Sequence, residues 1–464
     1  MSNEIEIKNV LKDFLNETSL PIDLSKITDC SIDLDKATED VIVFYKNHND
    51  EKSVNLLEKR LEGSSAGFVV FKNKPKRKVI LPHVVVDENN FLDCQRRILN
   101  ILFPIKKTPK ILAITGTNGK TTTAFLLMQI LNQNGYGACF VGTTGLFLNG
   151  KKIPHDFQTT SPGLIDFWKI IFRHKKIDFF CIEASSHALD QKRFFGFHFD
   201  EVAFTNISRD HLDYHKNFES YFLAKKKILD YLKPDGRCFV LDSEDEIFQK
   251  LSDKRCVKVK VPEIKRSHPF FNVDFNKKNL AIAEAISAKI VGPGFSCNYD
   301  ELDPPNGRLE IISFGEDNFG VVDFAHTPDA VENVLSEIKK AFPNHSIKVV
   351  FGCGGNRDKK KREEMGEIVS ALSNSFVITN DNPRDEDPEL IVQDILPGVI
   401  QGVGYQVELD REKAIESSVR SMEKREILLI LGKGHEDYQL AKGVKTYFSD
   451  KEVLLNSIKS KNES

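Results

Sequence analysis

The stretch ILAITGTNGKTTT, residues 111–123, constrains the fold more than any other part of the chain. Its first four apolar residues predict a buried strand, and Ala124–Leu131 has the pattern of a helix. Between them, Gly116 and Gly119 allow a tight turn in which backbone N–H groups converge near the positive end of the helix dipole. A strand, a glycine loop and a helix in this order predict a phosphate site in an α/β domain.

Two side chains of this loop predict a nucleotide with its metal ion. Lys120 is placed to reach the terminal phosphates, and the Thr121 hydroxyl is placed beside the accompanying Mg²⁺. The complete Walker spacing requires a glycine where Ile114 stands, so the loop matches a shortened form. A plain glycine turn without a ligand is the alternative.

The composition excludes several classes of protein. The 65 basic and 68 acidic residues nearly balance and form no long basic block, which argues against a nucleic-acid partner. No apolar run reaches the ~18 residues of a membrane span, and the start of the chain is too charged for a signal peptide, so we expect a cytoplasmic protein. The eight cysteines contain no CxxC pair and are expected to be reduced, without a chemical role.

The hydrophobic pattern predicts an α/β protein of three domains. Residues 1–107 predict a small α/β domain, residues 108–304 a mostly parallel sheet covered on both faces, and residues 305–464 a second doubly wound, Rossmann-like domain. The predicted strands are Val41–Tyr45, Gly67–Phe71, Lys78–Leu81, Ile111–Ile114, Ala138–Val141, Phe179–Ile182, Val202–Thr205, Cys238–Leu241, Gly320–Val322, Lys348–Phe351, Phe376–Thr379, Gln406–Leu409 and Ile427–Leu431.

Polar residues follow the strands of the central domain, where an open parallel sheet binds its ligands. Glu183 ends an apolar run and is either a metal-binding carboxylate or a helix-capping or loop acid. Further on, His211 and His215 have the spacing of a zinc pair, but no third strong ligand stands nearby. An exposed polar turn is the alternative there.

Lys225 lies within the apolar stripe of a predicted helix. Tyr221, Ile228 and Leu232 share its helical face, whereas Lys226 and Lys227 point away. Such a lysine extends to the edge of the core, pairs with an acid, or loses its proton by desolvation and can then be modified.

Four polar loops at strand ends of the last domain are expected to converge on one rim. Arg357 and Arg384 suit a carboxylate, and Glu436 suits an ammonium group, so the rim predicts a pocket for a zwitterion. Several of these residues are also ordinary turn formers. The loops are DFAHTPD at 323–329, GCGGNRDKKKR at 352–362, NDNPRDED at 380–387 and GKGHEDYQ at 432–439.

A set of motifs in this order resembles a known family. The motifs are GTNGKTT, EASSHALDQKR, TNISRDHLDYH, YFLAK, DFAHTPD, GGNRD, DNPR and GKGHEDYQ, and they span about residues 110–440. The chain resembles the Mur ligases of peptidoglycan synthesis, and within them the enzymes that add the third peptide residue.

The resemblance implies a ligase that uses ATP and Mg²⁺. The γ-phosphate would pass to a carboxylate of UDP-N-acetylmuramoyl-L-alanyl-D-glutamate, and the amine of meso-diaminopimelate would displace it, with catalysis by positioning and charge stabilisation. The motif DNPR resembles that of meso-diaminopimelate ligases, where Arg384 would bind the distal carboxylate that L-lysine lacks. The rival hypotheses are L-lysine addition, a folate polyglutamate ligase and a P-loop regulatory ATPase.

The resemblance also implies roles by motif position. Those for catalysis are Lys120, Glu183, His211 and Lys225. Those for metal are Thr121, Glu183, His211 and Lys225, the last as a carbamate. Those for ATP are Gly116, Thr117, Asn118, Gly119, Lys120, Thr121, Thr122, Asn206, Asn276, Asn279, Arg308 and Asp323. Those for the UDP-sugar peptide are Ser31, Thr159, Thr160, Ser185, Gln191 and Arg193. Those for the added amino acid are Arg357, Asp381, Asn382, Pro383, Arg384, Gly432 and Glu436.

Two departures from the family pattern stand out. Asn356 occupies a position where the family usually has Asp, and the family's uridine-side motif DSR is here only Asp29, Cys30, Ser31 and Ile32. Ser31 is therefore the candidate on the uridine side. We expect a monomer whose three domains close around ATP, because a ligase must keep water from an acyl phosphate.

Overall fold

The computed structural model describes residues 2–14, 23–47, 50–76, 79–155, 157, 159–262, 268–315 and 317–462. The chain forms two compact units. Unit 1 comprises Met1–Thr115, Gly137–Val202 and Arg209–Cys238, and unit 2 comprises Gly116–Tyr136, Ala203–Ser208 and Phe239–Ser464. The boundaries of the three predicted domains stay a prediction.

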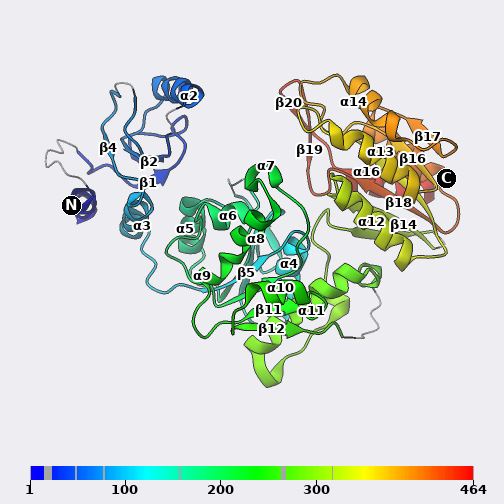
Figure 1. Ribbon diagram of the computed structural model, residues 1–464, viewed down its shortest axis with the longest axis horizontal. Helices are drawn as coiled ribbons and strands as arrows, with labels where there is room; N and C mark the ends of the chain where they lie inside the picture. Colours follow the sequence, from blue (N-terminus) through cyan, green and yellow to red (C-terminus); the bar gives the residue numbers. More distant parts are fainter. Residues whose placement is uncertain are drawn as a thin grey trace. The chain divides into compact units, whose positions relative to one another are not determined.

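A small parallel sheet in the order β1-β2-β3-β4 organises the start of the chain, the blue part of Figure 1. The middle strands are buried on both faces, as the run VIVFY predicts. The third predicted strand is wrong: Lys78 lies outside the described residues, Ile80 is 94% exposed, and pairing begins only beyond Pro82. The elements are α1 Ser2–Asp13, β1 Asp29–Ser31, β2 Val41–Tyr45, α2 Glu51–Glu62, β3 Phe68–Phe71, β4 His83–Val85 and α3 Phe91–Leu102.

The central sheet has eight strands in the order β12-β11-β10-β5-β9-β6-β7-β8. The pairs β5–β9 and β9–β6 are parallel, as predicted. Its strands are β5 Lys110–Thr115, β6 Ala138–Gly142, β7 Gly145–Leu148, β8 Lys151–Ile153, β9 Phe179–Glu183, β10 Glu201–Phe204, β11 Cys238–Leu241 and β12 Cys256–Val259. Its helices are α4 Lys120–Gln133, α5 Leu164–Arg173, α6 Ser186–Asp190, α7 Leu212–His215, α8 Phe218–Lys226, α9 Ile228–Tyr231, α10 Asp245–Leu251 and α11 Asp274–Val291, with the short 3-10 turns Pro269–Asn272, Gly292–Gly294 and Tyr299–Glu301.

The hairpin β7–β8 at one edge of this sheet was not predicted. Its turn is Asn149-Gly150, with φ values of 48° and 80°. Both residues are therefore left-handed, which suits the Asn-Gly pair and fits the twist of a two-residue hairpin. The dipeptide was the available signal.

The last sheet has six strands in the order β13-β14-β18-β15-β16-β17, and only the edge strand β13 runs antiparallel to its neighbour. This confirms a doubly wound arrangement; the predicted edge strand at 406–409 lies two residues earlier. The elements are β13 Glu310–Phe314, β14 Asn318–Asp323, α12 Pro328–Ala341, β15 Ser346–Phe351, α13 Lys360–Leu372, β16 Ser375–Ile378, α14 Pro388–Ile395, the 3-10 turn Leu396–Gly398, β17 Gly404–Val407, α15 Arg411–Arg420, β18 Glu426–Leu431, β19 Tyr438–Ala441, β20 Val444–Tyr447 and α16 Asp450–Asn462.

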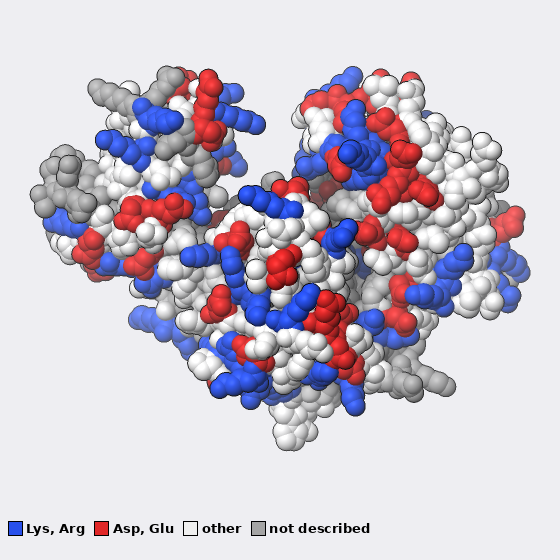
Figure 2. Space-filling model, viewed as in Figure 1, with Lys and Arg blue, Asp and Glu red and all other residues white. Residues whose placement is uncertain are grey.

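Across the described ranges, no helix is long and apolar enough to cross a membrane. Acidic and basic side chains intermingle over the face shown in Figure 2, as the balanced charge counts imply.

Candidate functional site

The glycine loop joins β5 to α4, as predicted, and its glycines are required by close packing. Gly116 has φ 143°, and a Cβ there would lie 1.9 Å from the Thr205 hydroxyl oxygen. Gly119 has φ 81°, and its Cβ would lie 2.3 Å from Asn279 Oδ1. No larger residue fits at either position without moving the neighbour, so the loop is held in one shape.

Side chains from outside the loop fix its backbone. The Thr205 hydroxyl donates to the Asn118 carbonyl at 2.6 Å, and Asn206 Oδ1 accepts from the Asn118 N–H at 2.9 Å. The Thr117 N–H donates to the Asn206 carbonyl at 3.0 Å. Asn206 therefore braces the loop; Thr205 was not among the predicted site residues, although it precedes Asn206 in the motif TNIS.

The polar side chains of the loop fit a phosphate group. Lys120 Nζ donates to the carbonyls of Gly116 and Thr117 at 2.9 and 2.7 Å, which keeps its charge over the loop. Thr121 and Thr122 are 5% and 6% exposed at the start of α4. A tight loop with two glycines that exclude a Cβ, an ammonium group and a helix N-terminus together suit an anion.

The asparagines of α11 stand behind the loop. Asn279 Oδ1 accepts from the Thr123 hydroxyl at 3.3 Å, and Asn276 Nδ2 donates to the Phe270 carbonyl at 3.1 Å. Asn276 is 1% exposed, and its Oδ1 has no hydrogen-bond partner among the described residues. Asn276 Oδ1 therefore has capacity left for a ligand.

Glu183 is the last residue of β9, and Ile114 of β5 is its register partner. It is 1% exposed, and its carboxylate accepts from the Thr143 N–H at 2.7 Å and the Thr143 hydroxyl at 3.1 Å. The capping interpretation is wrong, because Ser185 caps α6 by accepting from the Ala188 N–H. Glu183 is therefore a buried carboxylate at the end of β9, the strand that pairs with β5.

The predicted residues for the sugar peptide gather around Arg193 in unit 1. Its guanidinium donates to the Thr159 hydroxyl at 3.2 Å and, through Nε and Nη2, to Gln191 Oε1 at 3.1 and 2.9 Å. Burial lowers the pKa of Arg193. The Thr160 hydroxyl meets that of Thr143 at 3.2 Å, and the Ser185 hydroxyl meets that of Ser161 at 3.1 Å.

Ser31 has a separate setting, at the end of β1. Its hydroxyl accepts from the Asp33 N–H at 2.9 Å, and the neighbouring Asp29 pairs with Lys169 at 2.5 Å.

His211 lies in a cluster of aromatic rings. Its ring centroid is 4.8 Å from that of His187, which is 5.5 Å from that of His215. His215 Nε2 lies 3.0 Å from the Ser186 hydroxyl. Within the described ranges, no group of three His, Cys, Asp or Glu residues could hold a metal ion. The zinc interpretation of His211 and His215 is therefore not supported.

Lys225 is buried, as the helical pattern predicts. It is 1% exposed, and Nζ lies 4.5 Å from the centroid of the Tyr221 ring. Lys226 is half-buried, and Lys227 pairs with Asp190 at 2.6 Å. Of these three lysines, one alone points into the core.

The loops of the last domain converge on one rim, as expected. A Cβ on Gly432 would lie 2.6 Å from Asp381 Oδ2, and Asn382 Nδ2 donates to Glu436 Oε2 at 2.8 Å. Arg384 Nη1 donates to the Gly355 carbonyl at 2.8 Å. The loops after β15, β16 and β18 are thus in direct contact.

The remaining rim residues lie close by. Pro383 is buried, and its carbonyl oxygen would lie 1.9 Å from a Cβ on Gly355. Arg357 is exposed, with its Cγ 3.8 Å from a Cβ position on Gly354. Asn356 Nδ2 donates to Asp385 Oδ2 at 2.9 Å. An Asp at position 356 would instead place a second carboxylate against Asp385, which explains the amide here.

The two predicted ATP residues at the start of the last domain differ in setting. The Asp323 carboxylate accepts from the N–H groups of Leu309 and Ala325, both at 2.7 Å, and burial raises its pKa. The Arg308 guanidinium lies 4.9 Å from the centroid of the Phe324 ring. In this structure Asp323 therefore acts as a brace, and Arg308 is stacked.

Lys433 was missed by the sequence analysis. It is 0% exposed, and Nζ lies 3.1 Å from Asn382 Oδ1. The available signal was a lysine between two glycines, separated by Gly432 from the end of the buried strand β18.

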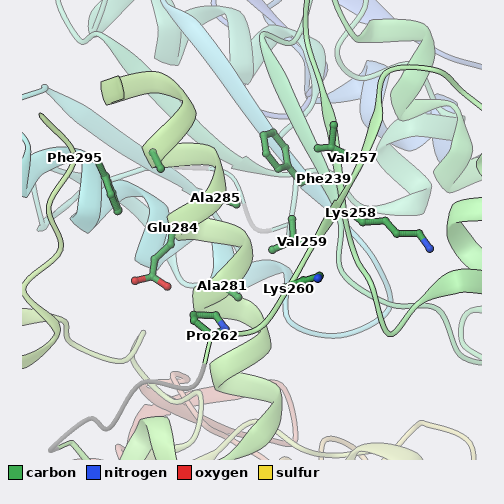
Figure 3. A pocket seen from close by; sticks show the side chains of 11 residues that line it. Phe239, Val257, Lys258, Val259, Lys260, Pro262, Ala281, Glu284, Ala285 and Phe295 are labelled. Atoms are coloured by element: carbon green, nitrogen blue, oxygen red, sulfur yellow. The ribbon is translucent and has the colours of Figure 1, made fainter. Parts of the chain in front are cut away.

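A cavity of about 450 Å³ lies beside α11, and Figure 3 shows Phe239 and Val259 facing the side that carries Ala281 and Ala285. None of the predicted site residues lines it.

Comparisons with known proteins identify the family of this chain. Residues 114–289 match the family model of the Mur ligase middle domain, and residues 307–434 match that of the Mur ligase, glutamate ligase domain. A UDP-N-acetylmuramoyl-L-alanyl-D-glutamate--2,6-diaminopimelate ligase of Oceanobacillus iheyensis is 33% identical over 445 residues, 86% of this chain and 88% of that protein. A protein of the same name from Helicobacter hepaticus is 33% identical over 439 residues, which are 87% of this chain and 92% of that protein.

Solved structures share the architecture. A structure of a ligase with the same name has a TM-score of 0.59 and 26% identity, and the match covers 94% of this chain and 96% of that one. MurF ligase from Thermotoga maritima in complex with ADP has a TM-score of 0.58 over 94% and 99% of the two chains, and at 13% identity it shows the fold alone.

Proposed function

This chain belongs to the Mur ligase family of ATP-dependent, amide-forming ligases, and we propose that it joins meso-diaminopimelate to UDP-N-acetylmuramoyl-L-alanyl-D-glutamate. The observation that carries the proposal is the meeting of two loops: Asn382, beside Arg384, donates to Glu436 at 2.8 Å. A cation and an anion at one rim suit an amino-acid substrate. The relatives named as 2,6-diaminopimelate ligases support the choice of acceptor.

The glycine loop binds the phosphates in this proposal. ATP supplies the γ-phosphoryl group that turns a carboxylate into an acyl phosphate, which has a better leaving group. Backbone N–H groups of the loop and the Lys120 ammonium offset the charge of the phosphates. The unpartnered Oδ1 of Asn276 is a candidate acceptor for the nucleoside.

Oxygen ligands for Mg²⁺ come from several elements in this proposal. The Thr121 hydroxyl and the Glu183 carboxylate are the donor types that Mg²⁺ prefers. His211 is assigned by the family resemblance alone, since an imidazole is a less usual partner for this ion.

Lys225 would add a further oxygen ligand as a carbamate. The neutral amine attacks carbon dioxide, a nitrogen–carbon bond forms, and the amine loses a proton to solvent. Lys225 is buried on the face of α8 that carries Tyr221.

Charged side chains select the amino acid that is added. Arg384 would bind the distal carboxylate of meso-diaminopimelate, and Glu436 would bind an ammonium group. L-lysine lacks the distal carboxylate and would leave Arg384 without its partner. We expect the enzyme to act as a monomer in the cytoplasm, where its nucleotide substrates are made.

The test is a coupled assay of phosphate release and product mass. Phosphate release is expected to require the UDP-dipeptide and the amino acid together, and the product mass should match the UDP-tripeptide. Steady phosphate release without an acceptor would instead indicate a regulatory ATPase.

A further inference from the structure

Lys433 is a buried cation next to the rim where the loops after β15, β16 and β18 meet, which is called the acceptor rim below. None of the roles assigned above involves Lys433. Lys433 follows β18 and lies between Gly432 and Gly434, whose φ values are 116° and 52°. Its side chain is 0% exposed. A fully buried lysine costs free energy unless anions or acceptors surround it.

The partners of Lys433 are the residues proposed to hold the amino acid. Nζ lies 3.1 Å from Asn382 Oδ1 and 3.5 Å from Glu436 Oε2. Asn382 Nδ2 donates to the same Glu436 oxygen at 2.8 Å. Lysine, amide and carboxylate thus form a closed triangle.

The two oxygens of Glu436 are held unequally. Oε2 takes both the amide and the ammonium group, whereas Oε1 accepts from the Tyr438 hydroxyl at 3.4 Å. The weaker contact leaves Oε1 with more capacity for a new donor. The carboxylate is therefore anchored at one oxygen and available at the other.

The charges around Lys433 also support its contact with Glu436. Burial lowers the pKa of Lys433, and the carboxylates of Asp381 and Glu436 oppose that shift. Arg411 is the other buried cation nearby, and it is already paired with Asp450 at 2.7 and 2.8 Å. Lys433 is thus the cation that contacts Glu436 directly.

We propose that Lys433 is a positioning residue for the acceptor: it anchors Glu436 and Asn382 so that Glu436 Oε1 receives the ammonium group of the incoming amino acid. This inference rests on the proposed function, because it assumes an amino acid at this rim. Lys433 acts through Glu436 and need not touch the substrate.

The test compares Lys433→Met, which keeps an unbranched side chain but removes the ammonium group, with Lys433→Arg, which keeps the charge. With meso-diaminopimelate as acceptor, Lys433→Met is expected to raise the KM of the acceptor about tenfold or more, since one charge-assisted hydrogen bond is lost. The KM values of ATP and the UDP-dipeptide should stay within about twofold, because the altered contacts all lie at the acceptor rim. Lys433→Arg should recover part of the loss.

A double-mutant cycle with Glu436→Gln separates positioning from general damage. If Lys433 acts through Glu436, Lys433→Met should add little to the acceptor KM once position 436 is Gln. Full additivity of the two changes, or an acceptor KM that Lys433→Met leaves unchanged, would overturn the proposal.

ADP binding shows whether Lys433→Met is folded. If that variant does not bind ADP, Lys433→Gln is tested in its place. It keeps a donor for Asn382 and removes the charge, so a raised acceptor KM is again expected and an unchanged one refutes the role. A wild-type enzyme that forms no product with meso-diaminopimelate would instead refute the proposed function, which keeps the two failures distinct.

Discussion

The ammonium nitrogen of Lys225 lies 4.5 Å from the centroid of the Tyr221 ring, one helical turn away on the buried face of α8. The face of an aromatic ring stabilises a positive charge. A carbamate on Lys225 would replace that positive charge with a negative one.

Replacement of Lys225 tests the carbamate. Lys225→Ala is expected to lower kcat about 100-fold or more, because a charged group at the reacting centre is lost. Acetate or formate should restore part of the activity by supplying the missing carboxylate. Lys226→Ala is the matched control on the same helix and should keep its activity; full activity in Lys225→Ala would remove the carbamate from the mechanism.

Glycine replacements test the phosphate loop. Gly119→Ala would set a methyl group 2.3 Å from Asn279 Oδ1 and should abolish ATP binding in a calorimetric titration. Gly135→Ala is matched in φ, at 82°, but has nothing within 4 Å of its Cβ position. It should cost only the ~1 kcal/mol of a left-handed alanine and leave ATP affinity intact. Equal ATP affinity in the two variants would contradict the proposal that this loop binds the phosphates of ATP.

Arg384 should set the choice of acceptor. Arg384→Ala is expected to reduce kcat/KM for meso-diaminopimelate relative to L-lysine about tenfold to a hundredfold, since an ion pair to the distal carboxylate is lost. Steady-state kinetics with both amino acids measures the ratio. If the ratio of the two kcat/KM values equals that of the wild type, Arg384 does not bind the distal carboxylate.

The buried pair of Arg411 and Asp450 should matter for stability. Both side chains are 0% exposed, and the guanidinium makes two contacts with the carboxylate. Arg411→Met leaves Asp450 buried without its cation and is expected to cost about 3–5 kcal/mol in urea unfolding. The double variant Arg411→Met/Asp450→Leu should cost less; a larger loss in the double variant would contradict this account.

Glu386 should contribute a pH-dependent part of the stability. Its hydrogen bond with Arg362 lowers its pKa from 4.5 to about 2, with the Asn356 N–H in support. Because the folded-state pKa is the lower one, the contribution is present above pH 4.5 and is lost as the pH falls through about 2. The stability difference between the wild type and Glu386→Gln should shrink over that range, and a constant difference would refute the link.

The hydrophobic periodicity predicted which helix faces and strands are buried. It missed the hydrogen bonds between side chains that lie far apart in the sequence. The buried face of Lys225 follows from helical spacing alone, and β2 and β11 follow from unbroken apolar runs. The contact of Lys433 with Asn382 joins residues 51 positions apart, which no pattern in one sequence encodes. The brace of Asn206 on Asn118 spans 88 positions in the same way.

The metal roles of His211 and Lys225 came from family resemblance, whereas that of Thr121 followed from the loop pattern. His211 and His215 alone allowed a zinc pair or an exposed polar turn, and Glu183 alone was equally a metal ligand or a capping or loop acid. The structure excludes the cap because Ser185 performs it, and it adds Thr143 as the donor that holds Glu183. Sequence spacing could not choose between these roles, since each depends on which neighbours the fold supplies.

The most direct test of the central claim is phosphate release with one substrate omitted at a time. Phosphate should appear at full rate only when ATP, UDP-N-acetylmuramoyl-L-alanyl-D-glutamate and meso-diaminopimelate are all present, with the UDP-tripeptide formed in equal amount. Phosphate release that is unchanged when either the UDP-dipeptide or the amino acid is left out would contradict a ligase.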